Sequence, residues 1–192
     1  MPTPSRTSIA QIVAAGRGIL EAEGLDGLTM QRVAVAVGVR APSLYKRVDD
    51  RAALVRLIAI DAEAELSRTL DTAATGDDPR RDLEAIATAF RAFARANPEA
   101  YALLFRPLPD AFRPEVDPAS PGFAALFRTV EAIAGPDERL EAARTVVAWA
   151  NGFVGMELSG AFRMGGDVDR AFAFGARHIA DAISKPGRGA RR

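Results

Sequence analysis

Residues 28–54 read LTMQRVAVAVGVRAPSLYKRVDDRAAL, and this stretch decides the fold of the N-terminal part of the chain. Thr29 is a good N-cap, and apolar residues recur at helical spacing over the next two turns. Gly38 is expected to end that helix with a positive φ angle. A second helix of about two turns follows from Ala41 or Pro42, because a proline in the first turn removes an N–H that has no helical partner. The stretch therefore predicts a helix-turn-helix.

The second helix of this motif is expected to turn short and basic side chains outward, while Leu44 and Val48 face the core. Short side chains at its start allow close approach to a major groove, and the tyrosine and cations behind them can reach phosphates and base edges. The motif thus predicts binding to double-stranded DNA. The side chains predicted to contact it are Thr29, Gln31, Arg40, Ala41, Pro42, Ser43, Tyr45, Lys46, Arg47 and Arg51.

These residues resemble the DNA-binding domain of the tetracycline-repressor (TetR) family of one-component transcriptional regulators. The resemblance covers about residues 8–56, including an apolar helix that precedes the motif. Two later stretches are similar to one branch of the family's ligand-binding domains, in which a Trp is followed by His-Gly. Asn151-Gly152 stands at that place here, so no role of the histidine is carried over. The matching pieces are LT at 28–29, VAVAVGV at 33–39, PSLYKRV at 42–48, RAAL at 51–54, NPEAYALLFRP at 97–107 and WANGFVGMEL at 149–158.

The net charge of zero is unevenly divided along the chain. Residues 1–56 carry eight basic and five acidic side chains, residues 57–182 carry thirteen and twenty, and the last ten residues add four cations. A basic N-terminal part favours phosphate binding and predicts a salt-dependent affinity. The excess per subunit is small, so we expect tight binding to need a dimer.

The composition argues against several classes of protein. With no cysteine and one histidine, the chain lacks a disulfide framework, a thiolate nucleophile and the usual zinc ligands. We predict no catalytic residues, no metal and no cofactor. No apolar run reaches the length needed to span a bilayer, and the N-terminus lacks the apolar segment of a signal peptide. A cytoplasmic protein without membrane contact is therefore expected.

The remaining chain predicts further helices and no strand, giving an all-α fold of about nine helices, the number that the resemblance also implies. The proline-rich stretch 106–121 is expected to be a loop with a function or without order. We predict a helix-turn-helix domain over 1–50, a helical ligand-binding and dimerisation bundle over 51–184 and a mobile basic tail over 185–192. The predicted helices after the motif cover about 50–74, 79–97, 98–105, 120–134, 136–164 and 168–184.

All ten phenylalanines lie between residues 90 and 174, together with the single tryptophan. Such rings form either a plain core or an apolar pocket between helices. The resemblance favours a pocket, since these regulators mostly bind an effector in this domain. We expect a small apolar or aromatic effector with few charges. The predicted lining residues are Phe90, Phe93, Tyr101, Phe105, Phe127, Trp149, Phe153 and Met156.

Glycines and other small residues are concentrated in the last two predicted helices. Each glycine in a helix costs about 1 kcal/mol relative to alanine, which suggests that another helix approaches closely. The resemblance implies a dimer through these two helices, whereas packing within the chain is the alternative. The predicted interface residues are Gly155, Ser159, Phe172, Gly175 and Ile179.

The sequence therefore predicts a homodimeric, ligand-responsive, sequence-specific transcriptional regulator, foremost a repressor, on a palindromic operator. One alternative is a helical carrier or enzyme that retains a three-helix head. Another is an architectural DNA-binding protein without a ligand, for which a filled aromatic core is expected.

Overall fold

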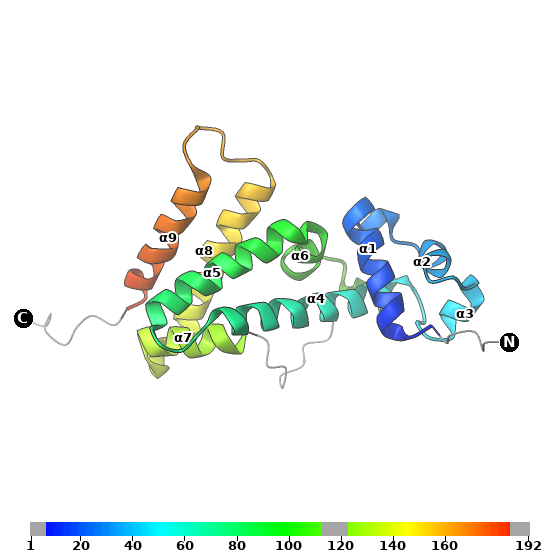
Figure 1. Ribbon diagram of the computed structural model, residues 1–192, viewed down its shortest axis with the longest axis horizontal. Helices are drawn as coiled ribbons and strands as arrows, with labels where there is room; N and C mark the ends of the chain where they lie inside the picture. Colours follow the sequence, from blue (N-terminus) through cyan, green and yellow to red (C-terminus); the bar gives the residue numbers. More distant parts are fainter. Residues whose placement is uncertain (1–6, 113–122, 185–192) are drawn as a thin grey trace, which may run out of the picture. The chain divides into compact units, whose positions relative to one another are not determined.

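The computed structural model describes residues 7–112 and 123–184, and within these ranges the regular structure is helical, without a strand (Figure 1). The predicted all-α fold is thus confirmed, whereas the predicted tail 185–192 lies outside the described residues. None of the described helices is long and apolar enough to cross a membrane. The elements are α1 (Ile9–Gly27), α2 (Met30–Ala36), α3 (Ala41–Tyr45), α4 (Arg51–Ala73), α5 (Pro79–Ala96), α6 (Pro98–Phe105), η1 (Asp110–Phe112), α7 (Ala124–Ala134), η2 (Pro136–Glu138), α8 (Arg139–Leu158) and α9 (Val168–Ala182).

The chain forms two compact units, each built from separate parts of the sequence. The first unit combines residues 1–64 with 97–119, and the second combines 65–96 with 120–192. Helices α6 and η1 therefore belong to the same unit as the helix-turn-helix, although the predicted domains place them in the bundle. Helix α4 contributes its first part to one unit and its last turns to the other.

Side-chain caps set the start of the helices in the first unit. The Ser8 hydroxyl accepts the Gln11 N–H (3.2 Å) and the Gln11 side chain accepts the Ser8 N–H (2.8 Å), which forms a capping box. The Thr29 hydroxyl accepts the Arg32 N–H at 3.3 Å and begins α2, as predicted. The turn after α2 contains Gly38 with φ of +72°, which confirms the expected left-handed residue.

The core of the first unit contains side chains from α6 as well as from the helix-turn-helix. Ile12 and Leu20 of α1, Leu44 of α3 and Leu54 of α4 are buried together with Leu103 of α6. Closed packing of this kind removes apolar surface from water and is the main stabilising term of the unit. The α6 segment is therefore part of the hydrophobic core that positions the helix-turn-helix.

The second unit packs α5 against α7, α8 and α9. Helix α8 ends at Leu158, so the prediction that it extends to Met164 was wrong. Gly160 has a φ of +66°, a left-handed conformation that stops the helix. Helix α7 begins after Phe123, and residue 120, at the predicted start of this helix, lies outside the described residues.

Candidate nucleic-acid interface

Helix α3 presents one buried face and one exposed face. Leu44 and the following Val48 are buried, and the Leu44 carbonyl accepts the Val48 N–H at 3.1 Å. Pro42 and Ser43 are exposed, and Tyr45 is 49% exposed despite its large ring. Leu44 thus packs the second helix of the motif onto the core, and the predicted DNA-contacting side chains of this helix stay accessible.

The basic side chains of the helix-turn-helix region fall into two groups. Seven lie within residues 7–64, and four of them bind partners inside the first unit: Arg17 bonds Asp61 (3.2 Å) and Asn97 (2.9 Å), Arg32 pairs with Glu23, and Arg51 and Arg56 bond backbone carbonyls. Among the described residues, no hydrogen bond or ion pair engages the other three side chains, all exposed. These are Arg40, Lys46 and Arg47, which flank α3. We call them the flanking cations.

Arg51 makes several contacts within the first unit, and its contact with DNA stays a prediction. Its Nε donates to the Leu28 carbonyl at 2.7 Å and its Nη2 to the Leu25 carbonyl at 2.5 Å. The guanidinium also lies 5.3 Å from the centre of the Phe112 ring, within the range of a cation–π contact. The side chain is partly buried, so Arg51 positions the start of α4 beside the helix-turn-helix.

Helix α6 is tied to α1 by its N-terminus. The Glu21 carboxylate accepts the N–H groups of Glu99 (3.1 Å) and Ala100 (2.9 Å). Two N–H groups that have no partner within α6 are thereby satisfied, and a negative charge lies at the positive end of the helix. Together with the Arg17–Asn97 bond, this contact joins α6 to the helix that precedes the motif.

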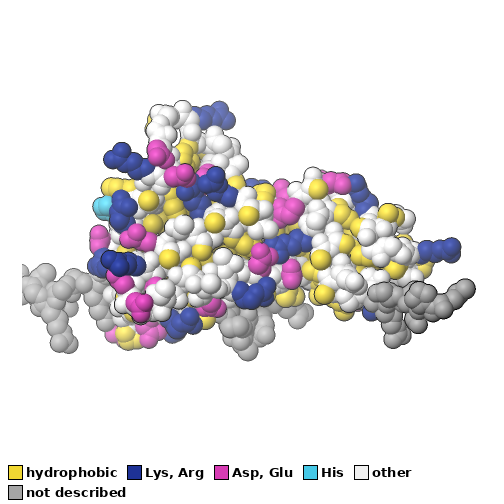
Figure 2. All heavy atoms as spheres, viewed as in Figure 1, with side chains coloured by type: hydrophobic (Ala, Val, Ile, Leu, Met, Phe, Trp, Pro, Cys, Tyr) yellow, Lys and Arg dark blue, Asp and Glu magenta, His cyan; other side chains and the backbone are white. Residues whose placement is uncertain are grey.

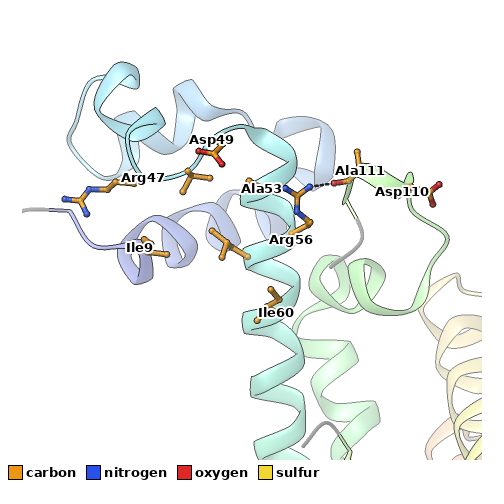
Figure 3. A pocket seen from close by; sticks show the side chains of 10 residues that line it. Ile9, Arg47, Asp49, Ala53, Arg56, Ile60, Asp110 and Ala111 are labelled. Atoms are coloured by element: carbon orange, nitrogen blue, oxygen red, sulfur yellow. Dashed lines mark hydrogen bonds between the residues drawn. The ribbon is translucent and has the colours of Figure 1, made fainter. Parts of the chain in front are cut away.

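Helix α3 is the recognition helix of the motif. A hollow of about 630 Å³ lies beside the segment that follows it, between the start of α1, the first half of α4 and η1 (Figure 3). Its apolar lining includes Val48 and Leu57, and Arg47 and Asp49 contribute charged groups. Figure 3 also shows Arg56 reaching across to the Ala111 carbonyl. None of the rings predicted to bind an effector lines this hollow.

The aromatic residues predicted to line an effector pocket are divided between the two units. Tyr101 and Phe105 belong to the first unit, where their rings lie 5.1 Å apart, and burial raises the pKa of Tyr101. In the second unit, Phe90 and Phe93 are buried on α5. Met156 is 48% exposed, contrary to what is expected of a pocket-lining residue. Neither unit therefore contains all eight predicted side chains.

Trp149 packs against rings and a glycine of its own subunit. Its ring lies 5.2 Å from that of Phe172 in a stacked arrangement, and Phe172 also contacts Phe153 at 5.1 Å. A Cβ atom added to Gly175 would lie 2.5 Å from Trp149 Cζ2, so Gly175 provides the space for the indole. Phe172 is buried and Trp149 lies against Gly175, so both residues pack within the second unit, and their place in a dimer interface stays a prediction.

The two glycines of α8 differ from Gly175, because no other part of the described chain lies close to them. A Cβ atom added to Gly152 or Gly155 would meet no other described atom within 4 Å. Close packing within the chain, the alternative to a dimer, therefore does not explain these two glycines among the described residues. Ser159, also predicted in the interface, is exposed, and Ile179 is half-buried.

An ion-pair cluster around the buried Arg91 of the second unit was not predicted. Arg91 of α5 donates to both Glu157 carboxylate oxygens (2.7 and 2.6 Å) and to Asp169 (2.6 Å), and its guanidinium lies 4.8 Å from the centre of the Phe172 ring. The hydrogen bonds with Glu157 raise the pKa of Arg91. The sequence contained one sign of this role, since Arg91 shares a helical face with the buried Ala87 and Ala94.

Two stretches of the chain match models of one protein family. Residues 12–58 match the family described as "Bacterial regulatory proteins, tetR family", and residues 83–179 match "Tetracyclin repressor-like, C-terminal domain". The chain belongs to the TetR family. Membership of this family confirms the class predicted from residues 28–54, a helix-turn-helix transcriptional regulator.

Relatives include the HTH-type transcriptional regulator Rv1816 of Mycobacterium tuberculosis, which is 35% identical over 109 residues, 55% of this chain and 47% of the relative. The alignment thus spans about half the length of that relative. The uncharacterized HTH-type transcriptional regulator Rv0681 of the same organism is 28% identical over 159 residues, 82% of this chain and 73% of the relative.

Solved structures show the same fold at lower identity. A protein of unknown function from Rhodococcus sp. RHA1 has a TM-score of 0.77 and 23% identity, covering 96% of this chain and all of that one. A TetR variant from Acinetobacter baumannii AYE, solved in complex with minocycline, has a TM-score of 0.67 and 22% identity, covering 92% and 96%. Identities this low support the fold alone.

Proposed function

We propose that this TetR-family regulator is a homodimeric repressor that binds a palindromic operator and releases it when an effector binds. The DNA-binding part of this proposal rests on the distribution of the flanking cations. Four of the seven described basic residues in the region are neutralised or hydrogen-bonded internally, while Arg40, Lys46 and Arg47 at the recognition helix remain available. Cations without internal partners beside an exposed helix are what phosphate binding requires.

The dimer is proposed to form through α8 and α9. One face of α8 and its C-cap exposes only small side chains, which recur at helical spacing: Ala148, Gly152, Gly155 and the C-cap residue Ser159. On α9, Phe174 is 57% exposed although it is a large apolar ring. A self-complementary face of this kind fits a two-fold dimer, which would present one recognition helix to each half of a palindrome, about one helical turn apart.

The effector is proposed to bind in the second unit, near the aromatic residues of α5, α7 and α8. Two observations support a site there: the concentration of rings, and the minocycline complex of the Acinetobacter relative with the same fold. The Arg91–Glu157 pair adds a buried polar group that the apolar composition did not suggest. We propose an apolar or aromatic effector that favours one of two arrangements of α4 and thereby changes the separation of the recognition helices.

Selection from a random duplex library followed by gel-shift titration tests the DNA-binding part. Tyr45→Ala and Lys46→Ala are expected to weaken operator binding well beyond twofold while fold and dimer persist, because both side chains are exposed beside Pro42 and Ser43. An affinity within about twofold of the wild type for both variants would contradict the proposed interface. Light scattering that finds a monomer at micromolar concentration would contradict the proposed dimer.

Trp149 fluorescence tests the effector part, since it is the single tryptophan. Hydrophobic compounds that shift its emission are expected to release the operator at the same concentrations. Compounds that bind near Trp149 but leave operator affinity unchanged would instead support a helical carrier. A protein that binds operator and none of the compounds would support an architectural role.

A further inference from the structure

We propose that the flanking cations have different tasks: Arg40 selects a guanine in each operator half-site, whereas Lys46 and Arg47 contact phosphates. Pro42 is proposed to select a neighbouring thymine through its methyl group. This inference rests on the proposed DNA-binding function and names the bases that the recognition helix distinguishes.

Arg40 lies at the N-terminal end of the recognition helix, which is the end expected to enter the major groove. It is the N-cap residue of α3, and in helix-turn-helix proteins the N-terminal residues of this helix contact base edges. Its side chain forms no cap hydrogen bond, so the guanidinium is not needed to hold the helix. Arg32 offers the contrast within the same unit, since its guanidinium is paired with Glu23.

The chemistry of the guanidinium favours guanine over the other bases. Its planar arrangement of N–H donors matches the two acceptors, O6 and N7, that guanine displays in the major groove. Adenine offers a donor beside its N7, which would meet an N–H of Arg40 with another donor. A free arginine at the leading end of the helix therefore distinguishes between the two purines.

The next two residues have no polar side-chain atoms, but Ala41 packs against the core and Pro42 is exposed. Pro42 presents only carbon and also lacks a backbone N–H. Such a side chain cannot hydrogen-bond a base edge, but it can contact the C5 methyl group of thymine, which cytosine lacks. The first turn of α3 therefore combines one hydrogen-bonding group with an apolar surface.

Lys46 and Arg47 follow the last residue of α3, at the opposite end from Arg40. Arg47 also borders the hollow beside α4, where Figure 3 shows its side chain extending away from that helix. Cations behind the tip of a recognition helix are suited to the sugar–phosphate backbone, and such contacts carry no direct sequence information. They should contribute to the salt dependence of binding, whereas Arg40 should contribute to sequence preference.

The experiment uses the full chain and the best half-site found by selection. Selection is expected to return a guanine with an adjacent thymine in each half-site. Replacing that guanine by 7-deazaguanine, which lacks N7, or the thymine by uracil, which lacks the methyl group, is expected to weaken wild-type binding. For the guanine we expect a loss of roughly 5- to 100-fold.

Variants separate the two tasks. Arg40→Ala and Arg40→Lys are expected to bind the guanine and 7-deazaguanine duplexes with equal affinity. Arg47→Ala is expected to keep the preference and to lower the slope of log affinity against log salt by about 0.9. Arg32→Ala serves as the control for loss of an arginine and is expected to keep the base preference.

Two outcomes are distinguishable. If the wild type shows no preference among duplexes, the proposed sequence-specific function fails. If the wild type is specific and Arg40→Ala retains the full preference for guanine, with only a reduced salt slope, then Arg40 is a phosphate contact and this inference is overturned.

Discussion

The glycines of α8 allow a prediction in which the monomer and the dimer respond in opposite directions. Gly152 and Gly155 lie inside a helix with nothing of their own described chain within 4 Å of an added Cβ atom. Replacing both by alanine should therefore stabilise the isolated subunit, because alanine loses less backbone entropy and meets no obstacle. If a second subunit packs on this face, the same methyl groups should weaken the dimer.

The magnitudes follow from the structure. Each replacement in the helix should raise the free energy of unfolding of the subunit by about 0.5–1 kcal/mol, or about 1–2 kcal/mol for the pair. Each extra methyl group in a tightly packed contact costs about 1–3 kcal/mol, and two-fold symmetry places every substitution in the interface twice. The four added methyl groups thus cost about 4 kcal/mol at the lower bound, and since about 1.4 kcal/mol is tenfold in affinity, the dimer Kd should rise by several hundredfold or more.

Two other glycines supply matched controls. Gly18 is an exposed glycine of α1 that also has nothing within 4 Å of an added Cβ atom, so Gly18→Ala should stabilise the subunit and leave the Kd unchanged. Gly175→Ala should act differently, because its methyl group would lie 2.5 Å from Trp149 Cζ2. We expect it to displace the indole, shift Trp149 fluorescence and offset the gain in helix propensity.

The measurements are sedimentation over a range of subunit concentrations and urea unfolding at concentrations below the Kd. A Gly152→Ala, Gly155→Ala double variant that dimerises as tightly as the wild type would refute the assignment of this face to the interface. A double variant that is less stable as a monomer would refute the premise that the face is open within the subunit.

Three further outcomes are expected. Arg91→Gln should cost about 1.5–3 kcal/mol in urea unfolding, because it removes two charge-assisted hydrogen bonds from Glu157 and leaves only Arg95, 4.0 Å away, as its cation; a loss below about 1 kcal/mol would contradict this. Backbone N–H bonds, first of all that of Thr75, lower the pKa of folded Asp82, so its contribution to stability is present above about pH 4 and is lost as the pH falls; Asp82→Asn should flatten that dependence. Arg51→Ala should lower thermal stability and weaken binding to all duplexes alike with an unchanged salt slope, whereas a slope reduced by about 0.9 would restore Arg51 as a phosphate contact.

The electrostatic basis of DNA binding could be predicted only in part. The sequence places an excess of cations in the first 56 residues, and Figure 2 shows charged side chains of both signs on the surface of the chain. A count of charges does not reveal which cations are bound internally. Arg40 and Arg51 have the same side chain and lie on either side of the recognition helix, yet only Arg51 is held by two carbonyls.

The sequence by itself determined the helix-turn-helix, because each of its decisive features is local. Thr29 caps α2 through an N–H three residues ahead, and Gly38 adopts a left-handed conformation that depends on its lack of a side chain. Such constraints act over one turn of chain, so composition and spacing along the sequence suffice to recognise them.

Only the tertiary structure decided which side chains from distant segments meet. Gly155 and Gly175 are alike in sequence context, since both lie in helices rich in small residues, but only Gly175 faces an indole from another helix. Arg91 finds its carboxylates 66 and 78 residues further along the chain. The pairing depends on how α5, α8 and α9 pack against one another, and that packing is set by many side chains at once rather than by any local pattern.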